Sequence, residues 1–242
     1  MRAGNNGITA ETVNNIQFGA GTIHKGLKFN SYVELTTEPA DFSTNYQKYY
    51  TKSGSSEPYT YTPLESSTAF ASGTYYAKTW NFEESCVGAT KGGSSVKIEP
   101  EFYTVQPDGS AVAVKNFKRK TGEKATMDVN LLELNPDMIK ASVIGADGVS
   151  DIEGMGLIVS KDAIVEGDYW ENIAFVGETL DNKNIIVILP NALCTSGLSI
   201  EGKSGEESVG KFTFECHGDA NESLTTLPYK IYYPNASAVG LG

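Results

Sequence analysis

One segment of the sequence matches the phosphate-binding pattern G-x4-G-K-S residue for residue. Its fixed positions are Gly197, Gly202, Lys203 and Ser204. A working phosphate loop follows a buried strand and opens a helix, whose backbone N–H groups and dipole hold the phosphate. Here Leu198–Glu201 alternates like a strand, and Gly205 and Gly210 disfavour a helix after it. We therefore interpret the match as a chance one at a hairpin tip, and expect no nucleotide cofactor.

The histidines and carboxylates form no catalytic or metal-binding set in the sequence. The two histidines, His24 and His217, lie near no cysteine or carboxylate at metal-ligand spacing. The carboxylate pairs that could perform acid–base chemistry are Glu99 with Glu101 and Asp128 with Glu133. On exposed strand faces such carboxylates usually serve as solvated charge. We expect no catalytic residue, no metal site and no enzymatic activity.

The amino-acid composition indicates which classes of partner the protein could bind. The 242 residues include 30 acidic and 19 basic ones, giving a formal charge of −11. This balance argues against tight nucleic-acid binding, which depends on Lys and Arg neutralising phosphates. The three widely spaced cysteines, Cys86, Cys194 and Cys216, indicate reduced thiols rather than a disulfide framework. Neither a signal-peptide core nor a membrane-spanning apolar run occurs, so we expect a cytosolic chain without a membrane partner.

One basic cluster interrupts this acidic chain. It comprises Lys115, Lys118, Arg119, Lys120 and Lys124. Phe117 lies among these residues, so the cluster superficially resembles a nucleic-acid patch. In so acidic a chain we favour pairing with carboxylates across a subunit boundary, which sets register and orientation in an assembly. The cluster is therefore our candidate subunit or ring interface.

Short alternating segments separated by turn residues predict a mainly β fold, an antiparallel sandwich or barrel. The predicted strands are Val96–Thr104, Ala125–Leu134, Leu157–Val159, Asn172–Glu178, Asn184–Leu189, Leu198–Glu201, Lys211–His217 and Tyr229–Tyr233. Ile185–Leu189 is apolar throughout, which predicts a strand covered on both faces. Met127–Leu131 alternates, which predicts one wetted face, and Asp181–Asn184 predicts a turn.

One short helix is predicted beside this sheet structure, over residues 135–145. Asn135 is a suitable N-cap, Pro136 fits the first helical position, and Asp137 complements the helix dipole. Gly145 is expected to end the helix. The expected buried side is formed by Met138, Ile139 and Val143.

Residues 30–79 differ from the rest, because they are crowded with Ser, Thr and Tyr. Within them Tyr49–Lys52 is echoed by Tyr75–Lys78. We interpret this stretch as a small β-rich or loop insertion in a core domain made of residues 1–29 and 80–242. Exposed tyrosines also suit contact with carbohydrate or protein. The alternative function is therefore a surface-binding module that recognises a glycan or a protein through the insertion.

Several segments, in this order and spacing, resemble the major tail (tail tube) proteins of long-tailed, siphovirus-like phages and prophages. They are NNIQFGAGTIHKGL, NFEESCVGATKGG, VKNFKRKTGEKATMDVNLLEL, ENIAFVGETLDNKNIIVILPNALCTSGLSIE, KFTFECHGDANES and LPYKIYYP. The resemblance covers residues 10–28 and 80–234. It implies a β-sandwich flanked by one helix, with six copies closing into a ring and rings stacking into a hollow tube that delivers the genome.

The resemblance also implies partners and location. The chain would bind itself and other tail proteins (tape measure, tail terminator and distal tail), while DNA passes through the lumen without specific binding. Its place would be the virion tail, after assembly in the bacterial host cytoplasm. Thr104–Lys124 would be the excursion that reaches a neighbouring subunit or ring, the terminal arms Met1–Thr9 and Asn235–Gly242 would bridge rings, and the insertion would project outward.

Overall fold

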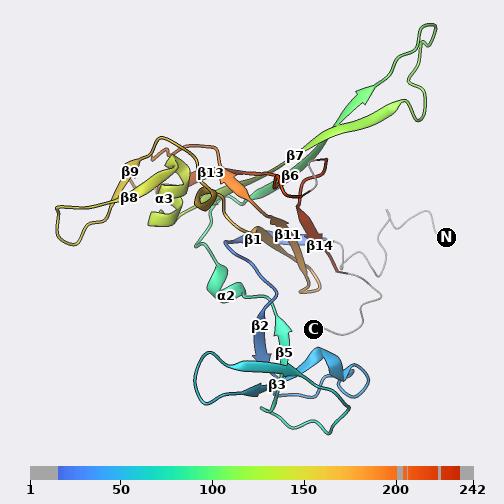
Figure 1. Ribbon diagram of the computed structural model, residues 1–242, viewed down its shortest axis with the longest axis vertical. Helices are drawn as coiled ribbons and strands as arrows, with labels where there is room; N and C mark the ends of the chain where they lie inside the picture. The colour runs from blue at the N-terminus through green and yellow to red at the C-terminus, as the bar shows by residue number, and fades with distance from the viewer. Residues whose placement is uncertain (1–15, 201–203, 206, 223–224, 235–242) are drawn as a thin grey trace. The chain divides into compact units, whose positions relative to one another are not determined.

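The computed structural model describes residues 16–200, 204–205, 207–222 and 225–234. They divide into two compact units (Figure 1). The core unit contains the described residues of 16–26 and Cys86–Tyr233, and the insertion unit contains Leu27–Ser85 with Pro234. The insertion unit thus begins at Leu27 and ends at Ser85, where the sequence placed an insertion at 30–79. The predicted terminal arms lie outside the described residues.

Two four-stranded antiparallel sheets build the core unit. In the first, the order is β1 (Gln17–His24), β10 (Ile173–Thr179), β11 (Asn184–Leu189) and β14 (Lys230–Tyr232). In the second, the order is β12 (Ala192–Cys194), β13 (Gly210–Cys216), β7 (Lys118–Leu131) and β6 (Ser95–Thr104). The inner faces of both sheets contribute to one buried cluster. The predicted mainly β fold is confirmed, and its architecture is a sandwich.

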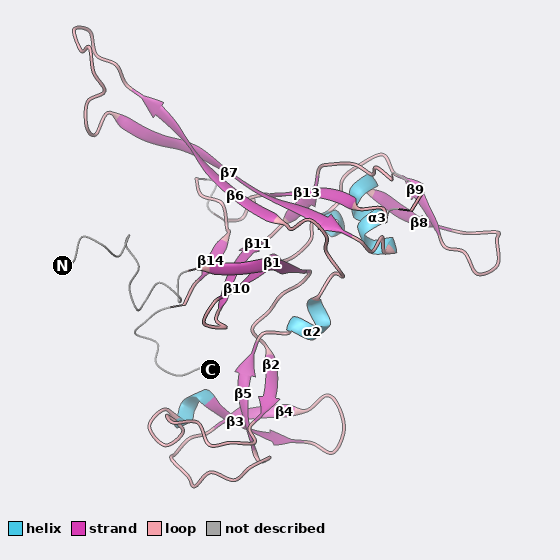
Figure 2. Ribbon diagram, turned by 180° about the vertical axis from the view of Figure 1, so that it is seen from behind, coloured by secondary structure: helices cyan, strands magenta, loops and turns pink. Residues whose placement is uncertain are grey.

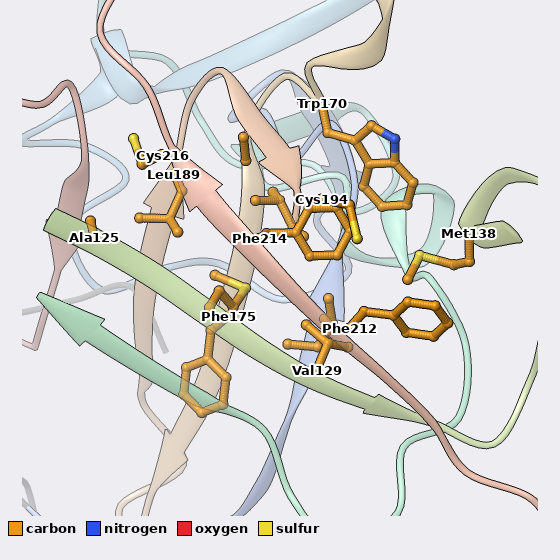
Figure 3. Close-up of a cluster of buried hydrophobic side chains, with 14 of the residues drawn as sticks. Ala125, Val129, Met138, Trp170, Phe175, Leu189, Cys194, Phe212, Phe214 and Cys216 are labelled. Carbon is orange, nitrogen blue, oxygen red and sulfur yellow. The ribbon is translucent and has the colours of Figure 1, made fainter. Parts of the chain in front are cut away.

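The core between the sheets follows the alternation of the strands. Figure 3 shows Val129 from β7 and Phe214 from β13 in one cluster with Phe175 from β10 and Leu189 from β11. Along β7 the buried residues alternate with exposed Asp128, as the sequence predicted for Met127–Leu131. In a strand, every second side chain points to the same face of the sheet. Apolar residues at these positions are therefore buried together when the two sheets pack, which stabilises the fold.

Helix α3 spans Pro136–Val143 and packs at one end of this core through Met138. The Asn135 side chain accepts a hydrogen bond from the Met138 N–H at 2.8 Å, so the predicted N-cap is confirmed. The helix ends earlier than predicted, because Ile144 takes the left-handed conformation and Gly145 begins a strand. The prediction that Val143 is buried was wrong: residues four apart share a helix face, and Ser142 takes that place below Met138.

The remaining core elements connect these layers. β8 (Gly145–Gly148) and β9 (Leu157–Ser160) form a two-stranded sheet, and η2 (Glu166–Asp168) follows. The predicted turn between β10 and β11 is confirmed, with the Thr179 N–H donating to the Lys183 carbonyl at 2.8 Å. The predicted strand Leu198–Glu201 was wrong for its described part. Gly197, at φ +71°, follows β12, and residues 198–200 pair with no described strand.

The insertion unit has its own four-stranded antiparallel sheet, ordered β2, β5, β3 and β4 (Figure 2). Its elements are β2 (Ser31–Glu34), η1 (Tyr46–Lys48), β3 (Tyr49–Ser53), β4 (Thr60–Pro63), β5 (Tyr75–Thr79) and α2 (Phe82–Ser85). The two echoing sequences lie side by side as β3 and β5, with Tyr50 opposite Tyr76. On one face of the sheet, Tyr49 and Tyr75 bury Phe42 in a separate small core.

Candidate assembly surface

The longest hairpin of the core unit extends well beyond the sandwich. β13 pairs with β7 only from Thr126 to Leu131, so Lys118–Ala125 of β7 pairs with β6 alone. Ala125, at the inner end of this segment, is still buried in the core cluster. At about 3.3 Å per residue, the seven residues Lys118–Lys124 span roughly 23 Å, and the loop 105–117 adds to that reach. Figures 1 and 2 show this projection from both sides. We call residues 98–125 the arm.

The predicted excursion Thr104–Lys124 is loop over most of its length, but its two ends belong to the strands β6 and β7. Only residues 105–117 form the loop, and β7 already begins at Lys118, opposite Thr104. A bulge between Glu101 and Phe102 shifts the register of the two strands. Bulges bend and twist a hairpin, so the part of the hairpin beyond Phe102 runs in a different direction from the sheet to which it belongs.

The five basic residues of the predicted interface all lie on the arm, but they have different partners. Lys120 forms an ion pair with Glu123, and Lys124 pairs with Glu215 at 3.1 Å. The Lys118 ammonium lies 4.4 Å from the centre of the Phe102 ring. Within the described part of the chain, Lys115, Lys118 and Arg119 have no carboxylate partner. These three are the charges left for another molecule.

The arm also exposes large hydrophobic side chains, of which only Phe117 stood out in the sequence. They are Phe102, Tyr103, Val105, Val112, Val114 and Phe117. Val112 is 74% exposed and Tyr103 61%. Exposed apolar side chains gathered on one hairpin are typical of an interaction surface. The combination of apolar and cationic side chains suits contact with an apolar, acidic protein surface.

Glu123 anchors the base of the arm to the chain that leads into β14. Its side chain is 5% exposed and takes the ion pair from Lys120. It also accepts a hydrogen bond from the Leu227 N–H at 2.7 Å. Lys120 above all, with help from the Leu227 N–H and the Tyr229 hydroxyl, holds the pKa of Glu123 below its ordinary value of 4.5. A groove of about 730 Å³ lies beside this anchor, between the arm on one side and Gly218 and Thr225–Leu227 on the other.

We expect Glu123→Gln to lower the free energy of unfolding by about 2 kcal/mol at pH 7, because charge-assisted hydrogen bonds to a buried group are lost. The folded pKa is depressed, so the contribution of Glu123 is complete above about pH 4.5 and disappears as the pH falls through the folded pKa. Urea unfolding at pH 7 and pH 3 should therefore show parent and variant converging at the lower pH.

Glu99→Gln is the matched control, since Glu99 is on the same hairpin, exposed and paired only with Lys97 at 2.9 Å. It should change stability by less than about 0.5 kcal/mol at either pH. A gap between parent and Glu123→Gln that is equal at both pH values would contradict the anchor role.

The other residues with possible chemistry have local structural partners. His24 is buried on β1, with Nε2 2.8 Å from the Thr22 hydroxyl, while the His217 ring lies 2.9 Å from the Glu215 carbonyl. Asp128 accepts a hydrogen bond from the Thr213 hydroxyl at 2.6 Å. Glu133 accepts one from the Ala89 N–H at 3.3 Å, and Glu99 and Glu101 lie exposed on β6. The structure brings none of these into a common site.

The cysteines and the residues of the phosphate-loop pattern are the remaining groups with possible chemistry. Burial, assisted by the charge of Glu123, raises the pKa of the Cys216 thiol to about 12; Cys194 is also buried, whereas Cys86 is exposed. Gly202 and Lys203 lie outside the described residues. Ser204 forms an exposed turn with Gly205, and the next described regular element is strand β13, not a helix. Among the residues described, no cluster of three or more acidic, His or Cys side chains is arranged around a metal position.

Neither a membrane-spanning helix nor a known relative helps to assign the site. In the part of the chain that the structure covers, no helix has the length and hydrophobicity needed to cross a bilayer. Comparison with protein-family models gives no match, and comparison with curated proteins gives none either.

Proposed function

We propose that the protein is a structural subunit that assembles with copies of itself into stacked rings, forming the hollow tail tube through which a long-tailed phage delivers its genome. In this role the chain performs no catalysis and needs no cofactor. Its partners are further copies of itself and the other tail proteins, and its place is the virion tail. The β-sandwich with one flanking helix is the architecture that the sequence resemblance implies.

The observation that carries the proposal is the arm. In the outer half of the arm, β6 and β7 pair only with each other among the described strands. An isolated pair of strands is only marginally stable in water, so this part of the arm contributes little to the stability of a monomer. Another molecule could cover its exposed apolar side chains and supply carboxylates to the three cations that have no carboxylate partner among the described residues. An arm that reaches a neighbour is what a ring or a stack of rings needs.

Strand edges and charge agree with the same role. In the described residues β1 and β14 border one sheet, and β6 and β12 border the other. Unpaired edges are templates for another chain, and closing a ring of subunits can satisfy them. The net charge of −11 would let DNA move through a lumen with little adhesion, where a basic wall would hold it.

Electron microscopy of the concentrated, purified protein tests the proposal directly. We expect rings or tubes with a central hole after negative staining, and a sedimentation profile that shifts with protein concentration. A protein that stays monomeric at all accessible concentrations and ionic strengths would overturn it.

A second candidate function, recognition by the insertion unit, has one observation in its favour. The sheet face opposite the Phe42 core carries four tyrosines, Tyr32, Tyr50, Tyr61 and Tyr76. Tyr32 and Tyr61 stack on each other with ring centres 3.9 Å apart. The rings therefore cover one another, and a glycan or protein would meet mainly ring edges, hydroxyl groups and the nearby Lys52, which lies over Tyr59.

The insertion can be removed at a defined point. The Asn81 N–H donates to the Lys28 carbonyl at 3.1 Å, and the Lys28 N–H donates to the Asn81 side chain at 2.7 Å. Replacing residues 29–80 by Asn-Gly should therefore close the chain as a tight turn. We expect the core unit to fold and still form rings, because the deleted residues have their own core.

Microscopy and urea unfolding of this shortened chain check that expectation, and glycan-array binding of the full chain tests recognition. Binding that disappears with the insertion while rings persist would add recognition to the structural role. Loss of rings in a chain that folds would show instead that the insertion unit takes part in assembly.

A further inference from the structure

The core unit carries a second exposed hairpin, beyond helix α3. It consists of β8, β9 and the loop 149–156 between them, and we call residues 145–160 the β8–β9 hairpin. Among the described residues its strands pair only with each other. The sequence predicted one short strand here, Leu157–Val159.

The loop of this hairpin presents apolar side chains directly to solvent. Val149 is 96% exposed, Met155 63% and Ile152 60%. Leu157 and Val159, at alternate positions of β9, extend the exposed apolar side chains along one face of the strands. Neither half of the chain's own sandwich covers these side chains. Such a surface marks a contact with another protein.

All charges on the β8–β9 hairpin are negative. Residues 145–160 include Asp147, Asp151 and Glu153 and no Lys, Arg or His. Asp147 forms an ion pair with Lys140, with 2.8 Å between Oδ2 and Nζ. Asp151 and Glu153 have no cationic partner in the described residues. The β8–β9 hairpin is therefore apolar and acidic. Residues 102–119 of the arm are apolar and basic, with Lys115, Lys118 and Arg119 against the single carboxylate Asp108.

We propose that the β8–β9 hairpin of one copy is the acceptor for the arm of the next copy. This inference rests on the proposed self-assembly and names the two surfaces that meet. Charge complementarity selects the pairing: two arms would oppose cations to cations, and two β8–β9 hairpins would oppose carboxylates to carboxylates. Pairing arm with acceptor joins Lys118 and Arg119 to Asp151 and Glu153 and buries apolar side chains from both hairpins.

The geometry of the core unit makes this contact intermolecular. Figures 1 and 2 show the two hairpins leading away from the sandwich in different directions, with their tips far apart in both views. The contact joins two different surfaces, so it is heterologous: each added copy brings one arm and one acceptor. Such contacts propagate until they close into a ring or continue as a stack.

Reversing charge on one surface at a time tests the pairing. The arm-reversed chain carries Lys118→Glu with Arg119→Glu, and the acceptor-reversed chain carries Asp151→Lys with Glu153→Lys. We expect each alone to need about tenfold or more protein for assembly, the factor that corresponds to about 1.4 kcal/mol per contact. A control with Glu38→Lys and Glu65→Lys, in exposed loops of the insertion unit, changes the net charge as the acceptor-reversed chain does and should assemble like the parent.

Two restoration experiments separate specific pairing from general damage. In an equimolar mixture, each reversed surface finds a complementary one on the other variant, so assemblies should return with both chains in equal amounts. A single chain carrying all four reversals should likewise assemble near the parental concentration. Sedimentation and mass photometry measure both, and circular dichroism confirms that each variant is folded.

The outcomes distinguish the two levels of inference. If the parent forms rings but the acceptor-reversed chain assembles equally well, or neither restoration occurs, the pairing is wrong and the structural function stands. If the parent never assembles, the proposed function fails and the pairing with it. Restoration in the mixture together with loss in each variant alone supports the pairing.

Discussion

Replacing residues 103–119 by Asn-Gly should abolish the proposed ring and tube formation and leave the free energy of unfolding within about 1 kcal/mol of the parent value. The new turn joins Phe102 to Lys120, which already lie opposite each other. It removes Lys115, Lys118 and Arg119 with most of the exposed apolar side chains of the arm. The Lys120–Glu123 anchor remains, so the loss falls on contacts with other molecules.

Negative-stain microscopy shows the effect on assembly, and urea unfolding shows the effect on stability. Asp108→Asn, in the same loop, is the control: it keeps every cation and apolar side chain of the arm and should form rings like the parent. Normal rings from the shortened chain would exclude the arm as an assembly element.

Phe214→Ala lowers the free energy of unfolding by about 3–5 kcal/mol, which is a large share of the stability of a typical domain. Phe214 is fully buried on β13, between the two sheets, with its ring centre 4.9 Å from that of Trp170 (Figure 3). Truncation removes the aromatic ring and leaves a cavity that rigid sheets on both sides cannot close.

Phe102→Ala makes the same chemical change on the arm, where Phe102 is 51% exposed. Its cost should stay below about 1 kcal/mol, because little apolar surface returns to water. Urea unfolding of both variants gives the comparison. Equal losses for the two substitutions would mean that the arm is part of the folding core, contrary to the strand pairing.

Local sequence signals identified the elements whose structure depends on nearby residues. The alternation of Met127–Leu131 marks a strand between a core and solvent, and the turn at Asp181–Asn184 follows from residues that tolerate its backbone angles. The Asn135 cap acts within one helical turn. The helix end was missed because Ile144 adopts a left-handed conformation that an aliphatic β-branched residue seldom takes.

The candidate site was only half visible in the sequence. Its cations stand out in an acidic chain. The sequence does not show which of them are already paired within the chain, because Lys124 pairs with Glu215, a residue far away in the sequence. The acceptor was not visible at all. Val149, Ile152 and Met155 are isolated among Gly, Ser and acidic residues, a pattern typical of a loop. Only the fold shows that no described residue covers them.

The hydrogen-bonded pair of Lys28 and Asn81 gives the insertion unit the properties of an exchangeable cassette. The chain leaves and re-enters at one point, so β1 and the start of Cys86–Tyr233 keep their register whatever is placed between them. The same point offers engineers a splice site at which a foreign domain with adjacent termini would be displayed once per chain.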